Sequence, residues 1–201
     1  YSIAMLLIER IAASGKACPI QIFATDVDEG ALETGRRGIY PEALLADLGR
    51  KRLERFFTRV DAHSWQVSKQ LREAVLFAPQ NILSDAPFSR LDLVSCRNLL
   101  IYLDTELQKK LLPIFHYCLK PNGLLFLGSS ETIGHSTDLF ATVDKKWKVF
   151  RRKPSAPSGL AGLELPPVAP AHEGREKGVR ETVRVRRTLV CGGGRAGRAL
   201  G

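Results

Sequence analysis

Three short apolar runs, each followed at once by polar side chains, constrain the fold of this chain more than any other feature of its sequence. Ile20–Thr25 leads into Asp26, a second run ends just before Asn81, and Leu91–Ser95 leads into Cys96-Arg97-Asn98. Segments with helical periodicity lie between the runs, and this alternation predicts an α/β fold with a parallel sheet. Open α/β sheets bind their ligands at the carboxyl ends of the strands. The three strand ends therefore predict a nucleoside-cofactor site, in which a strand-end acid can accept hydrogen bonds from ribose hydroxyls.

The segments between the runs carry signals of helix ends. Asp28 and Asp104 are each suited to cap a helix that begins just after them. Glu42–Phe57 reads as a further helical stretch. Pro113 lies inside the helix that Asp104 begins, where it removes a backbone donor, so we expect a kink there. Residues 58–77 have a mixed pattern, which we interpret as a small β insertion.

The residues that could build a hydrophobic core stop near Phe150. Residues 151–201 contain no Phe, Trp or Tyr, but they hold 9 of the 17 glycines and 5 of the 11 prolines. Such a segment cannot bury enough apolar surface to offset its ordering entropy. We therefore expect one domain over residues 1–153, which is long enough for an ordinary core, and a disordered linker or tail over residues 154–201.

The net charge of +9 belongs mostly to the C-terminal segment. Residues 151–201 carry 11 Lys and Arg against 4 Asp and Glu, which gives +7, whereas residues 1–150 carry 19 against 17, which gives +2. A basic face suited to nucleic acid is therefore not indicated for the domain. The Arg-rich stretch Arg175–Arg187 could contact RNA or anionic lipid, but we interpret it as a solvated tail.

The cysteines and histidines show no ligand spacing, so the sequence predicts neither a metal site nor a disulfide framework. The four cysteines are Cys18, Cys96, Cys118 and Cys191. Reduced thiols are typical of a cytoplasmic protein. No apolar run approaches the roughly 20 residues that cross a bilayer, so we expect no membrane insertion. The chain opens on Tyr rather than Met, which suggests a piece of a longer protein.

Several strand-end motifs together resemble the catalytic domain of the CheR family, the chemotaxis receptor methyltransferases that esterify glutamates with S-adenosylmethionine. The motifs occur in the family's order and are Ala24-Thr25-Asp26-Val27-Asp28, Ala78-Pro79-Gln80-Asn81-Ile82-Leu83, Ser95-Cys96-Arg97-Asn98-Leu99-Leu100-Ile101-Tyr102 and Leu127-Gly128-Ser129-Ser130-Glu131. The resemblance implies a Rossmann-like class I methyltransferase sheet. Phe88-Ser89-Arg90-Leu91-Asp92 and Asp144-Lys145-Lys146-Trp147 look closest to the versions in large proteins that join methylesterase, methyltransferase and sensor segments.

The resemblance also implies roles for the strand-end residues in binding S-adenosylmethionine. Asp26 would hold the ribose, Asn81 and Ile82 would flank the adenine, and Arg97 and Asn98 would line the pocket near the methionine part. The residue types suit these roles, because a carboxylate can accept two hydroxyl hydrogen bonds and an amide can both donate to and accept from an adenine edge.

The same resemblance places Tyr102 close to the reacting methyl group, and either Arg97 or Tyr102 could orient the incoming carboxylate. An ionised glutamate is already a nucleophile, so catalysis would depend on alignment and the exclusion of water, without a general base. The implied partner is the cytoplasmic domain of a chemotaxis receptor, with methylesterase or sensor segments in the parent chain.

Each of these assignments has a structural alternative. A strand-end Asp is often a helix cap, although Asp28 is better placed than Asp26 for that role. Arg97 could be a surface ion-pair partner, and Tyr102 could serve packing. Glu131 could belong to the active site or be a cap, and the sequence does not decide between the two.

The chain departs from the family pattern at its start. The family's first strand and glycine-rich loop would lie just before Tyr1, so we expect a sheet without a central strand, with weak cofactor binding and impaired methyl transfer. A catalytically inactive regulatory module of a sensor protein is the alternative function. A dinucleotide-dependent oxidoreductase would need a Gly-x-Gly-x-x-Gly turn about 20 residues before Asp26, and Ser14-Gly15-Lys16 does not supply it.

Overall fold

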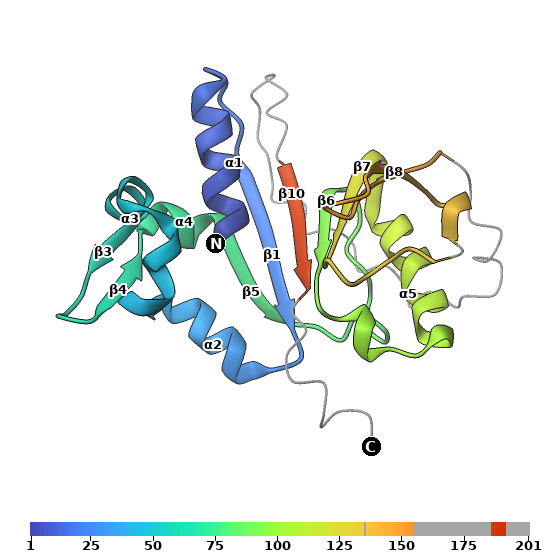
Figure 1. The fold of residues 1–201 in the computed structure, drawn as a ribbon, viewed down its shortest axis with the longest axis horizontal. Helices are drawn as coiled ribbons and strands as arrows, with labels where there is room; N and C mark the ends of the chain where they lie inside the picture. The colour runs from blue at the N-terminus through green and yellow to red at the C-terminus, as the bar shows by residue number, and fades with distance from the viewer. Residues whose placement is uncertain (135, 155–185, 192–201) are drawn as a thin grey trace, which may run out of the picture.

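A seven-stranded sheet runs through the computed structural model, which describes residues 1–134, 136–154 and 186–191. The strand order is β5-β1-β10-β6-β7-β9-β8, and every pair from β5 to β7 is parallel, whereas β9 is antiparallel to both of its neighbours. Figure 1 shows the sheet crossing the middle of the molecule, with α1 and α2 on one side of the picture and α5 on the other. The α/β sheet predicted from the alternating pattern is therefore confirmed.

The helices and strands have the following bounds. They are α1 Ser2–Ala13, β1 Ile20–Asp26, α2 Glu29–Arg37, β2 Ile39–Pro41, the 3-10 helix η1 Glu42–Leu48, α3 Arg50–Phe56, β3 Phe57–Arg59, β4 Ser64–Val67, α4 Lys69–Ala74, β5 Val75–Pro79, β6 Leu91–Cys96, η2 Leu100–Tyr102, α5 Thr105–Cys118, β7 Leu119–Leu127, η3 Ser136–Asp138, β8 Phe140–Asp144, β9 Val149–Arg152 and β10 Arg186–Cys191.

The two helix caps predicted from the sequence are confirmed, and one predicted helix is refined. Asp28 and Asp104 cap α2 and α5 with their side chains, accepting from Ala31 and Leu107. Helix α5 runs through Pro113 without interruption. The stretch expected to be one helix over 42–57 is divided at Gly49, whose φ of 74° lies in the left-handed region, so a 3-10 helix precedes α3.

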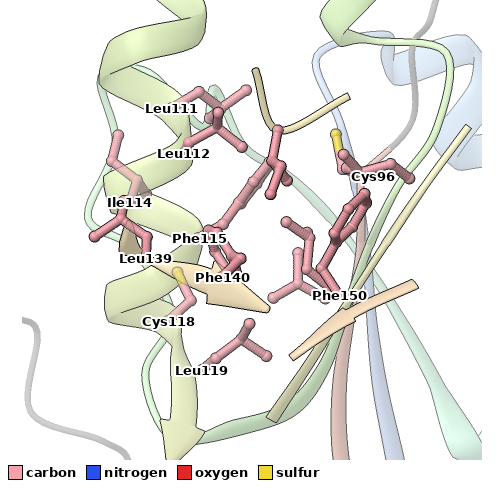
Figure 2. Packing of buried hydrophobic residues seen from close by; sticks show 14 of the residues in the cluster. Cys96, Leu111, Leu112, Ile114, Phe115, Cys118, Leu119, Leu139, Phe140 and Phe150 are labelled. Carbon is pink, nitrogen blue, oxygen red and sulfur yellow. The ribbon is translucent and has the colours of Figure 1, made fainter. Parts of the chain in front are cut away.

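Two apolar clusters hold the sheet between its helices. One joins α5 to the strands from β10 to β8, and Figure 2 shows its side chains packed between that helix and the sheet. The other joins α1, α3 and α4 to β1, β5 and the small strands β3 and β4. The first cluster holds Leu91, Val94, Cys96, Leu100, Leu111, Leu112, Ile114, Phe115, Cys118, Leu119, Leu125, Leu127, Ile133, Leu139, Phe140, Phe150, Leu189 and Cys191.

The expectation of a disordered tail over 154–201 is wrong for six residues. Arg186–Cys191 forms β10, which lies between β1 and β6 and pairs in parallel with both. Figure 1 shows this strand, in red, in the middle of the sheet. The expected sheet without a central strand is therefore also corrected, because a segment from the other end of the chain supplies it. Residues 155–185 and 192–201 lie outside the described part of the chain.

The residues expected to form a small β insertion, 58–77, divide between two parts of the fold. β3 and β4 form an antiparallel hairpin, and β2 joins β4 to complete a separate three-stranded sheet. The second half of the range forms α4 and the first residues of β5, which belong to the main sheet. Within residues 1–134, 136–154 and 186–191, no helix has the length and apolar character that a bilayer crossing requires.

Candidate active site

The predicted strand ends meet along one edge of the sheet. Pairing across the sheet joins Thr25 to Cys191, Cys191 to Cys96, and Cys96 to Leu127. On the other side of β1, Asp26 pairs with Pro79, and the N–H of Gln80 donates to the Asp26 carbonyl oxygen at 3.1 Å. Because these strands are parallel, the polar residues that follow them lie at the same edge.

Asp26 ends β1 in a half-buried position. Its Oδ1 accepts a hydrogen bond from the backbone N–H of Asp28 at 3.0 Å, while Asp28 uses its own Oδ1 to cap α2 by accepting from Ala31. The cap is therefore Asp28, as the sequence predicted. The Asp26 carboxylate is left at the sheet edge, where it can accept hydrogen bonds from a ligand.

Asn81 and Ile82 begin the loop that follows β5. The Asn81 side-chain oxygen accepts from the N–H of Leu83 at 3.1 Å, and the Asn81 N–H donates to Asp85 at 2.7 Å. Farther along this loop, the Phe88 ring stacks on Phe23 of β1 with centroids 4.6 Å apart. Asn81 is exposed, whereas Ile82 is half-buried against the cluster beneath α5.

Arg97 and Asn98 follow β6, and both are exposed. The Arg97 guanidinium lies 5.1 Å from the centroid of the Phe126 ring, so it stacks on a side chain of β7. Asn98 has a φ of 61°, in the left-handed region that Asn tolerates better than most residues. This conformation turns the chain sharply between β6 and η2.

Tyr102 lies in η2 with 57% of its surface exposed. Its backbone N–H donates to the Leu99 carbonyl oxygen at 3.0 Å. The exposed ring argues against the alternative that Tyr102 serves core packing. It leaves the side chain accessible near the loop that begins with Arg97.

Glu131 is buried at this edge, and the sequence did not decide its role. With 3% of its surface exposed, it accepts from the N–H groups of Leu99 and Leu100 at 2.8 Å each with Oε1, and from the Gly128 N–H with Oε2. These three hydrogen bonds connect the loop after β6 to the loop after β7. A Cβ on Gly128 would lie 2.6 Å from Oε2 of Glu131 and 3.0 Å from Oδ1 of Asn98, which explains the glycine. The sequence signal was a Glu placed three residues after a strand-end Gly.

Two buried thiols lie side by side beneath the edge. Cys96 of β6 and Cys191 of β10 are paired residues of neighbouring strands. The pKa of the Cys96 thiol is raised well above its usual range. The hydrogen bond to the Cys191 side chain is the largest cause, and burial is the second. Both cysteines are unoxidised and belong to the core, so they strengthen the junction between β10 and β6.

Comparison with known proteins assigns this arrangement to a family. Residues 1–149 match the model of the CheR methyltransferase, SAM binding domain. This chain belongs to the CheR family. Chemotaxis protein methyltransferase 2 of Pseudomonas aeruginosa is 36% identical over 149 residues, covering 71% of this chain and 52% of that protein. The chemotaxis protein methyltransferase of Escherichia coli is 39% identical over 144 residues, covering 67% and 48%.

A third relative is an uncharacterized 104.1 kDa protein of Rhodobacter capsulatus, 38% identical over 175 residues, which cover 85% of this chain and 18% of that protein. The chain thus spans about half the length of the two CheR-family methyltransferases and a smaller part of the third relative. The Rossmann-like sheet expected of a class I methyltransferase agrees with the strand order described above.

S-adenosylmethionine is the cofactor of this family's domain, and the residues present fit it. A carboxylate and an amide oxygen stand at neighbouring strand ends. Both are hydrogen-bond acceptors, and the ribose hydroxyls and the amino group of an adenosyl ligand are donors. Gly128 leaves room beside Asn98 that a side chain would fill. The edge is therefore suited in polarity and space to an adenosyl ligand.

Proposed function

We propose that this chain forms the site at which a methyl group passes from S-adenosylmethionine to glutamate side chains of chemotaxis receptors. The observation that carries the proposal is the convergence of Asp26, the loop of Asn81 and the loop of Arg97 on one edge of a CheR-family sheet. The names of two relatives, both chemotaxis methyltransferases, favour receptors as the substrate.

The proposed roles follow the contacts of each residue. Asp26 accepts hydrogen bonds from the ribose hydroxyls, since its backbone contact to Asp28 uses Oδ1. Asn81 and Ile82 provide an amide and an apolar surface for the adenine. Asn98 lies beside Gly128 and lines the methionine end of the pocket.

Arg97 and Tyr102 are the residues proposed to orient the substrate carboxylate. Both are exposed, and their segment is fixed from below by Glu131, so their backbone positions are set before substrate arrives. The bound cofactor supplies a methyl group on a positively charged sulfur, which is already activated for transfer. An ionised glutamate side chain is already a nucleophile, so these residues would not need to remove a proton from it. Alignment is therefore the main contribution of the protein.

The larger setting of the domain is part of the proposal. In the Rhodobacter capsulatus relative the matching region is a small part of a long chain, which supports a parent protein with further segments, such as a methylesterase or a sensor. The substrate would be the cytoplasmic domain of a receptor, so the proposed place of reaction is the cytoplasm.

A matched pair of substitutions two residues apart tests the cofactor site. Asp26→Asn removes the charge that would bind the ribose, whereas Asp28→Asn keeps a good helix cap. Hydrogen bonds to a charged group contribute roughly 1.5–3 kcal/mol, so we expect Asp26→Asn to weaken binding of S-adenosylhomocysteine at least about tenfold in calorimetry. Asp28→Asn should bind like the parent, and equal effects of the two variants would argue against the assignment.

The chemistry is tested with labelled S-adenosylmethionine and a receptor cytoplasmic domain. A glutamate methyl ester releases labelled methanol in mild base, whereas a methylated amine keeps its label. Base-labile label supports the proposed reaction, and base-stable label would contradict it. Cofactor binding without any transfer would favour the regulatory-module alternative.

A further inference from the structure

We propose that cofactor binding by this chain depends on its C-terminal strand, because β10 joins the two halves of the site. The inference rests on the proposed function, since it concerns the same adenosyl ligand. It assigns a binding role to a segment, residues 186–191, that lies outside the region matched by the family model, residues 1–149.

The pairing of β10 is extensive on both sides. Six residues of β10 are in register with β1, from Ile20↔Arg186 to Thr25↔Cys191, and four are in register with β6, from Thr188↔Leu93 to Cys191↔Cys96. The backbone N–H and C=O groups that β1 and β6 direct toward each other would lack partners if this strand were absent. β10 therefore completes the hydrogen bonding of the strands that carry the site.

The side chains of β10 are part of the core. Leu189 has 0% of its surface exposed and belongs to the cluster beneath α5, together with Cys191. Thr188 is also buried, and Val190 packs against the other cluster. Alternate side chains thus contact the two faces of the sheet, as in a strand covered on both sides.

The site needs β10 because the residues of the site lie on both sides of this strand. Asp26 ends β1, whereas Arg97 and Asn98 follow β6, and β10 separates the two strands in the sheet. Two steps of about 4.8 Å put these strands about 10 Å apart, a spacing that β10 fixes by bonding to both. Loss of β10 would remove the constraint that holds Asp26 at a set distance from the loop of Arg97.

The chain is long enough for β10 to come from the same molecule. Residues 155–185 make a connection of 31 residues, whose fully extended reach is about 100 Å, several times the radius of a domain of this size. We therefore commit to insertion within one chain, and exchange of the strand between two copies is an outcome that the experiment separates.

The experiment compares the whole chain with two Leu→Asp variants. Leu189→Asp puts a charge into the core and should expel β10, whereas Leu76→Asp makes the same change on β5 at a side chain that is 52% exposed. Hydrogen–deuterium exchange with mass spectrometry first reports the position of the strand. In Leu189→Asp, we expect β6 amides to exchange at least about tenfold faster than in the parent and in Leu76→Asp. Retained protection of α5 in the same data shows that the domain is still folded.

Calorimetry with S-adenosylhomocysteine then reports the dependence of binding on β10. We expect Leu189→Asp to bind at least about tenfold more weakly than the parent, and Leu76→Asp to bind like it. A second variant, a chain ending at Lys153, should show the same loss of β6 protection and of affinity.

The outcomes separate this inference from the proposed function. Unchanged β6 protection in Leu189→Asp, or affinity that survives the loss of protection, would overturn the inference and leave the proposed function intact. Protection that falls on dilution would show a strand supplied by a second copy and would overturn insertion within one chain. A parent chain that protects β6 and binds no S-adenosylhomocysteine would overturn the proposed cofactor site, and the binding role of β10 with it.

Discussion

The two halves of the candidate site are built in different ways. On the β6 and β7 side, one buried carboxylate, Glu131, accepts three backbone N–H groups and joins two loops. On the β1 and β5 side, Asp26 and Asn81 make local hydrogen bonds to residues two positions away, and these contacts are exposed. The contacts of Glu131 are thus part of the core, whereas the contacts of Asp26 and Asn81 lie at the surface.

This difference indicates how the halves divide the work. Buried hydrogen bonds to a charge are costly to lose, so the loop that carries Arg97 and Asn98 is fixed before any ligand binds. Exposed local contacts contribute little to stability, so Asp26 and Asn81 are free to serve a ligand. Substitutions in the first half should therefore lower stability, and those in the second half should lower affinity.

Glu131→Ala should have the largest effect. It leaves the N–H groups of Leu99, Leu100 and Gly128 without their acceptor, and each buried donor left unsatisfied costs roughly 1–3 kcal/mol. We expect the free energy of unfolding in urea to fall by about 3 kcal/mol or more, with a matching loss of methyl transfer.

The control for this variant is Glu73→Ala, at an exposed residue of α4 that pairs with Lys69 at 3.7 Å. An exposed pair of this kind contributes about 0–1 kcal/mol, so its loss should barely change unfolding. If Glu131→Ala is no more destabilised than Glu73→Ala, the contrast between the two halves of the site is wrong.

Asn81→Ala should lower the affinity for the cofactor more than the stability, and its effect should be smaller than that of Glu131→Ala. The variant loses an exposed hydrogen bond to the Leu83 N–H, so we expect a loss of stability below about 1 kcal/mol. The affinity for S-adenosylhomocysteine should fall about tenfold in calorimetry if the amide contacts the adenine. A variant that loses stability without losing affinity would show that Asn81 only shapes the loop.

Much of the site could be predicted because its residues follow strands with clear apolar patterns. Asp26, Asn81 and Arg97 each come just after such a run, and parallel strands bring their carboxyl ends to one edge. The resemblance to the CheR family came from motifs at these same positions, and the matching family model confirms it. The roles of the individual residues stay predictions.

The role of Glu131 and the position of β10 could not be predicted from local patterns. A buried carboxylate is recognised by the N–H groups that reach it, and those come from Leu99 and Leu100, about 30 residues away in sequence. β10 lies in a segment rich in Arg and Gly, whose composition favours disorder. Its pairing depends on a place between β1 and β6 that exists only in the folded sheet.

The pH dependence of unfolding extends the comparison to the core beneath the β7 side, with the smallest expected effect. His116 of α5 is fully buried, with Nε2 3.0 Å from the Lys153 carbonyl oxygen and its ring edge against Phe140. Burial lowers the pKa of His116, and the hydrogen bond to Lys153 partly opposes this. In acid the unfolded chain therefore binds more protons at this residue than the folded chain. The contribution of His116 to the free energy of unfolding is complete above the ordinary pKa of about 6.5 and is lost as the pH falls through the lower folded value.

We expect the urea midpoint to fall between pH 7.5 and pH 5, and to fall less in His116→Leu, which removes the titrating group. His63→Ala is the control for the removal of a histidine, because His63 is exposed in the turn of the small hairpin. An identical pH profile in His116→Leu would mean that other groups set the acid sensitivity. The acid-sensitive core would then no longer distinguish the β7 side from the β1 side, and the difference between the two halves would rest on Glu131 alone.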